Sequence, residues 1–264
     1  MMHLPVQAPS ALEYFAALVA DDASLPLLEA AITIAQDDHP ALDPQAVLGD
    51  IDALAARLKQ RLPNVNDYYD RRNSYLHEVL ISRRGIPITL ALLFCELAGQ
   101  IGLTARGVSF PGHFLVKLRM PQGEVVIDPF DGHSLSREDL DERLAPFRKR
   151  QGLEGDFETP LGLFLQTAPA RDVLARMLRN LKEIHRTTED WPRLLAVQQR
   201  LVLLLPGSAE ELRDRGLTWA ELGRRGEAAA DLEAYVAMAP GAGDAQALAE
   251  RAQELRRSGS PRLH

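Results

Sequence analysis

Two prolines in the C-terminal part of the chain, Pro206 and Pro240, are 34 residues apart, and each closes an apolar helical pattern. At this offset, residues 181–206 superpose on residues 215–240. A repeated helix–turn–helix unit of this length buries its apolar face only by stacking on its neighbours. This part of the chain is therefore predicted to be an array of helical hairpins.

The period of 34 residues is typical of the tetratricopeptide repeat. We expect one hairpin over residues 170–207, a second over residues 208–241 and a capping helix over residues 244–257. Arrays of this kind commonly present a concave face to a protein partner. Two hairpins make a short groove, so bracing of the rest of the protein is an equally open role for them.

A change of pattern marks the boundary of the repeats. Residues 141–169 mix charges, glycine and proline without a sustained period, which is typical of a connection between domains. We therefore predict one domain over residues 1–160 and a helical repeat domain over residues 161–264. Within the first domain, residues 1–80 are expected to be helical and residues 81–140 to form the core.

The core begins with the most apolar helical pattern of the chain, which starts at Pro87 and ends near Gly102. The period then changes to the alternation of strands, first over residues 105–109 and then on both sides of a turn at residues 121–123. A helix followed by a small antiparallel sheet, between segments that are otherwise helical, predicts a mostly helical α+β fold.

The order helix, strand, hairpin strand is the one in which papain-like enzymes present cysteine, histidine and aspartate. His113 and Asp128 fit the last two positions, although the register that would bring them together is not fixed by the sequence. Cys95 does not fit the first, because it lies eight residues after Pro87, or about 12 Å along the helix. A helix dipole acts within about one turn, so we expect Cys95 to be a core residue with a raised thiol pKa.

Several linked motifs resemble the bacterial SirB-type transglutaminase-like family, and they are found between Asn73 and Ala245. They are Arg84–Leu90, Ile101–Val108, Phe110–Phe114 and Ile127–Phe130 in the core, with Arg176–Lys182 and Leu212–Gly216 in the repeats. The resemblance implies a transglutaminase-like core followed by tetratricopeptide repeats. Counted back from Gly102, it places the catalytic cysteine position of active enzymes at Pro87, which has no nucleophile.

Three alternatives stay open. A hydroxyl of Thr89 or Ser109 is a candidate nucleophile with His113 and Asp128, which would give an amide hydrolase or acyl transferase. Asp128 with Asp131 and His133 has the residue types of a metal site, but Asp131 and its glycine neighbour are also typical of a turn. The pair His113 and Asp128 is equally consistent with simply pinning two strands together.

Composition excludes several classes of function. A net charge of −7 and a pI near 5.5 argue against nucleic acid as the partner. With one cysteine, and with no start resembling a signal peptide and no long uncharged apolar stretch, we expect a cytoplasmic protein without a disulfide, a metal site, a cofactor or a membrane span.

The sequence thus favours a non-catalytic regulatory protein that binds a protein or peptide. Binding would use the repeat groove or a cleft inherited from the enzyme fold. The residues expected to line that cleft are Pro87, Thr89, Ser109, His113 and Asp128.

Overall fold

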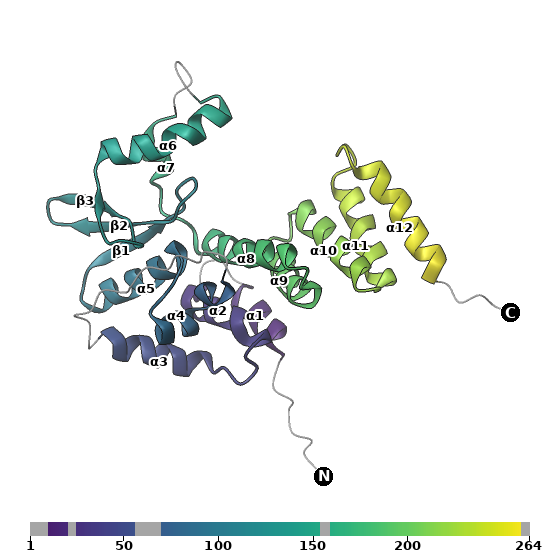
Figure 1. Cartoon of the computed structure of the whole chain (residues 1–264), viewed down its shortest axis with the longest axis horizontal. Helices are drawn as coiled ribbons and strands as arrows, with labels where there is room; N and C mark the ends of the chain where they lie inside the picture. The colour runs from purple at the N-terminus through teal and green to yellow at the C-terminus, as the bar shows by residue number, and fades with distance from the viewer. Residues whose placement is uncertain (1–9, 21–24, 56–69, 154–158, 260–264) are drawn as a thin grey trace, which may run out of the picture. The chain divides into compact units, whose positions relative to one another are not determined.

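The computed structural model describes residues 10–20, 25–55, 70–153 and 159–259 (Figure 1). By its contacts the chain divides into two compact units. The repeat unit comprises Met1–Leu25, Gln36–Pro40 and Leu178–His264, and the sheet unit comprises Pro26–Ala35 and Ala41–Met177. The repeat unit includes segments from the start of the chain, since α1 packs against α9. A domain boundary between residues 160 and 161 stays a prediction.

The sheet unit joins helices to one small sheet. In chain order its elements are α2 (Leu27–Thr33), α3 (Pro44–Ala55), the 3-10 turn η2 (Arg71–Ser74), α4 (Leu76–Ser82), α5 (Pro87–Gln100), β1 (Thr104–Val108), β2 (Leu115–Met120), β3 (Gly123–Ile127), β4 (Ser134–Leu135), α6 (Arg137–Gln151), α7 (Leu161–Phe164) and the start of α8 (Ala170–Thr187). Most of the elements are helices, and the strands form one antiparallel sheet. This confirms the predicted α+β class.

Helix α5, which forms from the most apolar helical pattern of the sequence, is the central helix of this unit. Pro87 occupies a first-turn position, where a missing N–H costs no intrahelical bond. The first half of the helix, residues 87–93, is buried, and α5 contacts α3, α4, β1 and β2. Gly102, with φ of +79°, then ends the helix in a conformation that favours glycine.

The sheet has the strand order β1-β2-β3-β4, and all its pairs are antiparallel. Met120 pairs with Gly123, so the hairpin between β2 and β3 has a two-residue loop. A Cβ at Gly107 would lie 2.8 Å from Cε1 of Phe114, which explains the glycine in β1. One apolar cluster includes residues of the strands, α6 and α7, and its buried members are Val108, Phe110, Leu115, Val126, Leu140, Leu144 and Leu161.

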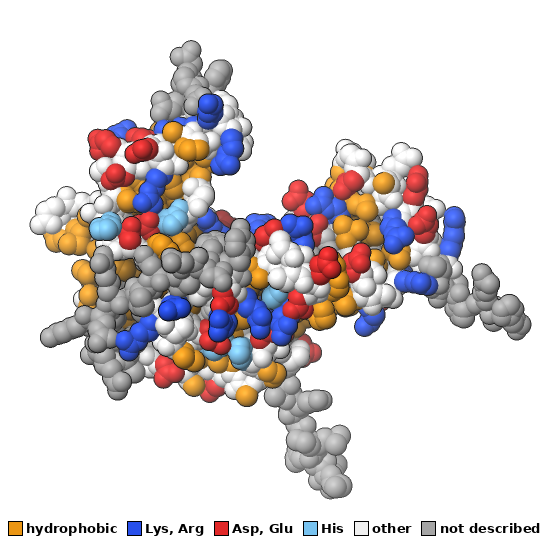
Figure 2. Space-filling view, in the orientation of Figure 1, with side chains coloured by type: hydrophobic (Ala, Val, Ile, Leu, Met, Phe, Trp, Pro, Cys, Tyr) orange, Lys and Arg blue, Asp and Glu red, His pale blue; other side chains and the backbone are white. Residues whose placement is uncertain are grey.

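The repeat unit is helical. Its elements are α1 (Ala11–Leu18), the rest of α8, α9 (Trp191–Leu204), α10 (Ala209–Glu221), α11 (Arg225–Met238) and α12 (Ala245–Gly259). A tight turn at Thr188–Asp190 joins α8 to α9, and α10 packs against α11 and α11 against α12. Two helical hairpins and a last helix confirm the predicted array. Acidic and basic side chains are interspersed over α10–α12 in Figure 2.

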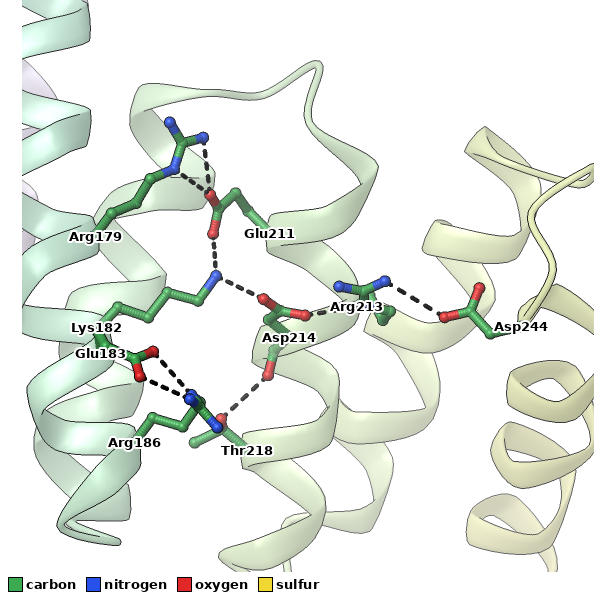
Figure 3. A network of polar contacts seen from close by, with 9 residues as sticks. All are labelled: Arg179, Lys182, Glu183, Arg186, Glu211, Arg213, Asp214, Thr218 and Asp244. Carbon is green, nitrogen blue, oxygen red and sulfur yellow. Dashed lines mark hydrogen bonds and ion pairs between the residues drawn. The ribbon is translucent and has the colours of Figure 1, made fainter. Parts of the chain in front are cut away.

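A network of charged side chains joins α8 to α10 (Figure 3). Glu211, only 3% exposed, accepts from Arg179 at 3.1 Å and from Lys182 at 2.6 Å. Lys182 also lies 2.6 Å from Asp214, whose other oxygen accepts from Arg213. The network fixes neighbouring hairpins in register through polar contacts.

None of the helices in the described ranges combines the length and the apolar composition that crossing a membrane requires.

Candidate functional site

The side chains of His113 and Asp128 are in direct contact. Gly112, with φ of +74°, turns the loop between β1 and β2, and His113 follows it two residues before the start of β2. Asp128 directly follows β3. Nε2 of His113 lies 2.9 Å from Oδ1 of Asp128. The contact whose register the sequence left open therefore exists.

The carboxylate of Asp128 is buried and has three hydrogen-bond donors. Besides His113, the backbone N–H of Phe130 donates to Oδ1 at 3.0 Å, and Nη1 of Arg143 donates to Oδ2 at 2.8 Å. Burial alone would raise the pKa of Asp128, but the three donors outweigh it and lower the pKa to about 2. The group is therefore an anion at neutral pH.

This anion fixes a proton on one ring nitrogen of His113. A carboxylate can only accept, so Nε2 of His113 carries a proton and donates it to Oδ1 of Asp128. The His113 side chain is 26% exposed, and the part of the chain that the structure describes places no hydrogen-bond partner on Nδ1. The arrangement resembles the acid and the histidine of a catalytic triad, in which the acid orients the histidine and the other ring nitrogen faces a reacting group.

Arg176, in the second turn of α8, contacts the loop that precedes His113. Its Nη1 donates to Oγ of Ser109 at 2.8 Å and to the carbonyl of Phe110 at 3.2 Å. The guanidinium also lies 5.5 Å from the ring centroid of Phe114, a cation–π distance. Ser109 is exposed, and its hydroxyl serves as an acceptor for Arg176.

The first turn of α5 holds the other two residues expected in the cleft. Pro87 is buried at the start of the helix. The buried Thr89 hydroxyl donates to the carbonyls of Asn73 at 2.9 Å and Ile86 at 3.0 Å. Within the described residues, neither Thr89 nor Ser109 is hydrogen-bonded to His113. The structure thus joins His113 to Asp128 and leaves both hydroxyls with other partners.

Comparison with known proteins accounts for both halves of the chain. Residues 55–179 match the Transglutaminase-like superfamily, and residues 181–253 match the Tetratricopeptide repeat family. The UPF0162 protein of Xylella fastidiosa strain Temecula1 is 37% identical over 245 residues, which are 83% of this chain and 86% of that protein. The chain belongs to the UPF0162 family. A UPF0162 protein of Pseudomonas aeruginosa is 28% identical over 261 residues, which are 90% of this chain and 94% of that protein.

Matches also extend to proteins with names other than UPF0162. Human F-box only protein 21 is 43% identical over 68 residues, which are 26% of this chain and 11% of that protein. No solved structure matches the chain. The two family matches confirm the transglutaminase-like and tetratricopeptide parts that the sequence motifs indicated.

In this member of the UPF0162 family the thiol of Cys95 is poorly suited to attack. Cys95 is half-buried in the second half of α5, eight residues after Pro87. Burial raises the pKa of its thiol to about 12, although Arg106 acts in the opposite direction. Since the thiolate is the nucleophilic form, this cysteine is almost entirely protonated, and thus unreactive, at neutral pH.

The residue types of the alternative metal site are used in a turn. Oδ1 of Asp131 accepts from the backbone N–H of His133 at 2.8 Å, and its Oδ2 lies 3.3 Å from Nδ1 of the same residue. Gly132 between them has φ of +76°. The carboxylate oxygens of Asp128 are hydrogen-bonded to His113 and Arg143. The contacts of Asp131 favour the turn interpretation.

Sequence reasoning missed two arginines of the site, Arg143 on α6 and Arg176 on α8. A buried carboxylate needs donors for both oxygens, but the burial of Asp128 became known only from the structure. Nothing in the sequence identified Arg143 as a donor, since it is 15 residues away and has charged neighbours of both signs. Arg176 lies within a motif of the family resemblance, but its role became visible only through its contacts with Ser109 and Phe110.

Proposed function

We propose that the protein is a non-catalytic binding protein that recognises a protein or peptide. Two features together support this proposal. Pro87 stands at the start of α5, and the thiol of Cys95 has a pKa of about 12. The chain's one cysteine is thus a poor nucleophile, while the oriented imidazole of His113 is retained. The alternative of an amide hydrolase finds little support, because the Thr89 hydroxyl is donated to backbone carbonyls.

The cleft would act through hydrogen bonding. When the imidazole is neutral and its proton is on Nε2, Nδ1 of His113 is an acceptor at a partly exposed position, and Asp128 maintains its orientation. Peptide backbones and amide side chains supply N–H donors that fit such an acceptor. Pro87, Thr89 and Ser109 complete the proposed cleft.

The tetratricopeptide helices are proposed to take part in binding, since repeats of this kind generally mediate protein interactions. We further propose a regulatory role in the cytoplasm, and a place among SirB-type transglutaminase-like proteins. These are proposals about the whole chain and do not depend on which face of the repeats is used.

Capture experiments with the full chain test the proposal. Immobilised wild type, His113→Ala and His133→Ala would be incubated with lysate of the source bacterium, and bound proteins quantified by mass spectrometry. His133 is the matched control, because its side chain is 72% exposed and belongs to a turn. We expect at least one saturable partner to be lost with His113→Ala and kept with His133→Ala. The same partners in all three samples would exclude the His113 cleft.

A further inference from the structure

Two short backbone hydrogen bonds shape the loop that carries His113. This loop, residues 109–114, joins β1 to β2. The N–H of Phe110 donates to the carbonyl of Val108 at 2.9 Å, and the N–H of His113 donates to the carbonyl of Phe110 at 3.1 Å. Both bonds close turns between near neighbours in the chain. The position of the loop, and of the imidazole on it, therefore depends on contacts from other elements.

Arg176 of α8 supplies such contacts on the N-terminal side of His113. Its Nη1 donates to Oγ of Ser109 at 2.8 Å and to the carbonyl of Phe110 at 3.2 Å. This carbonyl is the one that also accepts the backbone N–H of His113. The guanidinium and the backbone of His113 therefore share one acceptor, which places them next to each other.

Arg176 also contacts the residue that follows His113. The ring of Phe114 is 1% exposed, and its centroid lies 5.5 Å from the guanidinium. A Cβ at Gly107 would come within 2.8 Å of the same ring, so the ring packs directly on the backbone of β1. Arg176 thus contacts the chain on both sides of His113.

The start of α8 is itself attached to β1. The N–H of Ala168, just before the helix, donates to the carbonyl of Gly107 at 2.9 Å, and Thr167 forms a β-bridge with Val108. Arg176 follows in the second turn of α8, within the sheet unit. The guanidinium is therefore carried by a helix that is anchored to the strand from which the His113 loop departs.

We propose that Arg176 is the positioning residue of the His113 cleft. It holds the loop so that Nε2 of His113 meets Oδ1 of Asp128 and Nδ1 is presented to a ligand. Presentation to a ligand rests on the proposed function, whereas the effect of Arg176 on the imidazole does not. Because α8 is also the first helix expected in the repeats, that helix would brace the cleft, one of the two roles open for the repeats.

NMR of the ring nitrogens, with isotope-labelled histidine in the full chain, tests the effect on the imidazole without a ligand. Spectra are recorded at about pH 8.5, well above the ordinary pKa of a histidine side chain, and His113→Ala assigns the signals. We expect the wild type to hold the His113 proton on Nε2, which gives the two ring nitrogens well-separated shifts. In Arg176→Met the separation should fall by roughly half, because both tautomers become populated.

Three further variants separate positioning from a general loss of structure. Arg186→Met is the matched control, since Arg186 is on the same helix, is 60% exposed and pairs with Glu183, and it should leave the His113 shifts unchanged. Arg176→Lys keeps the charge and should restore part of the separation. Ser109→Ala removes one acceptor at an exposed position and should give a smaller change in the same direction. If Arg176→Met loses the sheet resonances, Ser109→Ala decides the outcome.

Unchanged His113 shifts in folded Arg176→Met, or equal changes in Arg186→Met, would overturn the proposal. Capture with Arg176→Met, beside wild type and His113→Ala, tests the ligand. We expect the partner that is lost with His113→Ala to be lost with Arg176→Met as well. A partner that requires His113 but is kept in full by Arg176→Met would refute the positioning role. If no partner depends on His113, the proposed function fails, and the shifts alone decide the role of Arg176.

Discussion

Nε2 of His113 lies 2.9 Å from Oδ1 of Asp128, although the two residues are not direct partners across the hairpin. Continued beyond Val116 and Ile127, the pairing of β2 with β3 would place Asp128 opposite Leu115. The contact is therefore diagonal, and the long imidazole bridges it. Because Arg143 of α6 holds the other carboxylate oxygen, Asp128 joins the loop before β2, the end of β3 and α6.

Asp128→Asn should destabilise the protein by roughly 1–3 kcal/mol, because a buried group loses charge-assisted hydrogen bonds. The asparagine amide can still accept from one donor, but its NH₂ group would face either Arg143 or His113. Urea unfolding followed by circular dichroism measures the change. Asp131→Asn is the control, since Asp131 lies in an exposed turn. Equal unfolding midpoints for the two variants would contradict the role assigned to Asp128.

The low pKa of Asp128 predicts how this contribution depends on pH. The folded pKa is about 2, below the ordinary value of about 3.9 for an unfolded aspartate. The stabilisation is therefore fully present above about pH 4 and is lost as the pH falls toward 2, and it amounts to roughly 2 kcal/mol. Unfolding free energies of wild type and Asp128→Asn should converge between pH 5 and pH 2.5. A constant difference over this range would show that these contacts do not lower the pKa of the Asp128 carboxyl group.

Pro87→Cys in a Cys95→Ala background should create a thiol of much lower pKa than that of Cys95. A helix N-terminus stabilises a thiolate, whereas a site two turns further gains little. We expect a pKa well below the value of about 12 for Cys95, because the helix N-terminus opposes the effect of burial at position 87. Thiolate absorbance at 240 nm against pH measures both. If adding His113→Gln raises the pKa of the thiol at position 87, the imidazole acts on that position. A thiol at position 87 with the same pKa as Cys95 would contradict the prediction.

The sequence was sufficient for the elements and insufficient for their contacts. The 34-residue spacing of Pro206 and Pro240 predicted the hairpins, because a repeat period is carried by the chain itself. The helix from Pro87 to Gly102 followed from apolar periodicity and a glycine end. The register of β2 against β3, by contrast, depends on the two-residue loop after Met120, which the sequence bounded only as a turn over residues 121–123.

Contacts that close over long separations were out of reach for a different reason. Arg176 reaches Ser109 across 67 positions, and any of several exposed arginines could have done so. Strand β4 is only two residues long, and a strand this short leaves no alternating pattern to recognise. Residues 1–9, 21–24 and 56–69 of the predicted helical N-terminal part lie outside the described residues.

Within the repeat unit, Lys182→Met should be far more damaging than Arg186→Met on the same helix. Lys182 is 16% exposed and neutralises both Glu211 and Asp214 at 2.6 Å, whereas Arg186 is 60% exposed and pairs with the exposed Glu183 (Figure 3). Removing Lys182 leaves the buried Glu211 carboxylate with Arg179 alone, at an expected loss of roughly 2–4 kcal/mol.

Urea unfolding of both variants measures the difference, and Arg186→Met should leave the midpoint nearly unchanged, since surface ion pairs contribute little. The double variant Lys182→Met/Glu211→Gln should regain part of the lost stability, because it removes the charge left without its lysine. If the double variant is less stable than Lys182→Met, the loss comes from packing of the lysine stem and not from the buried carboxylate.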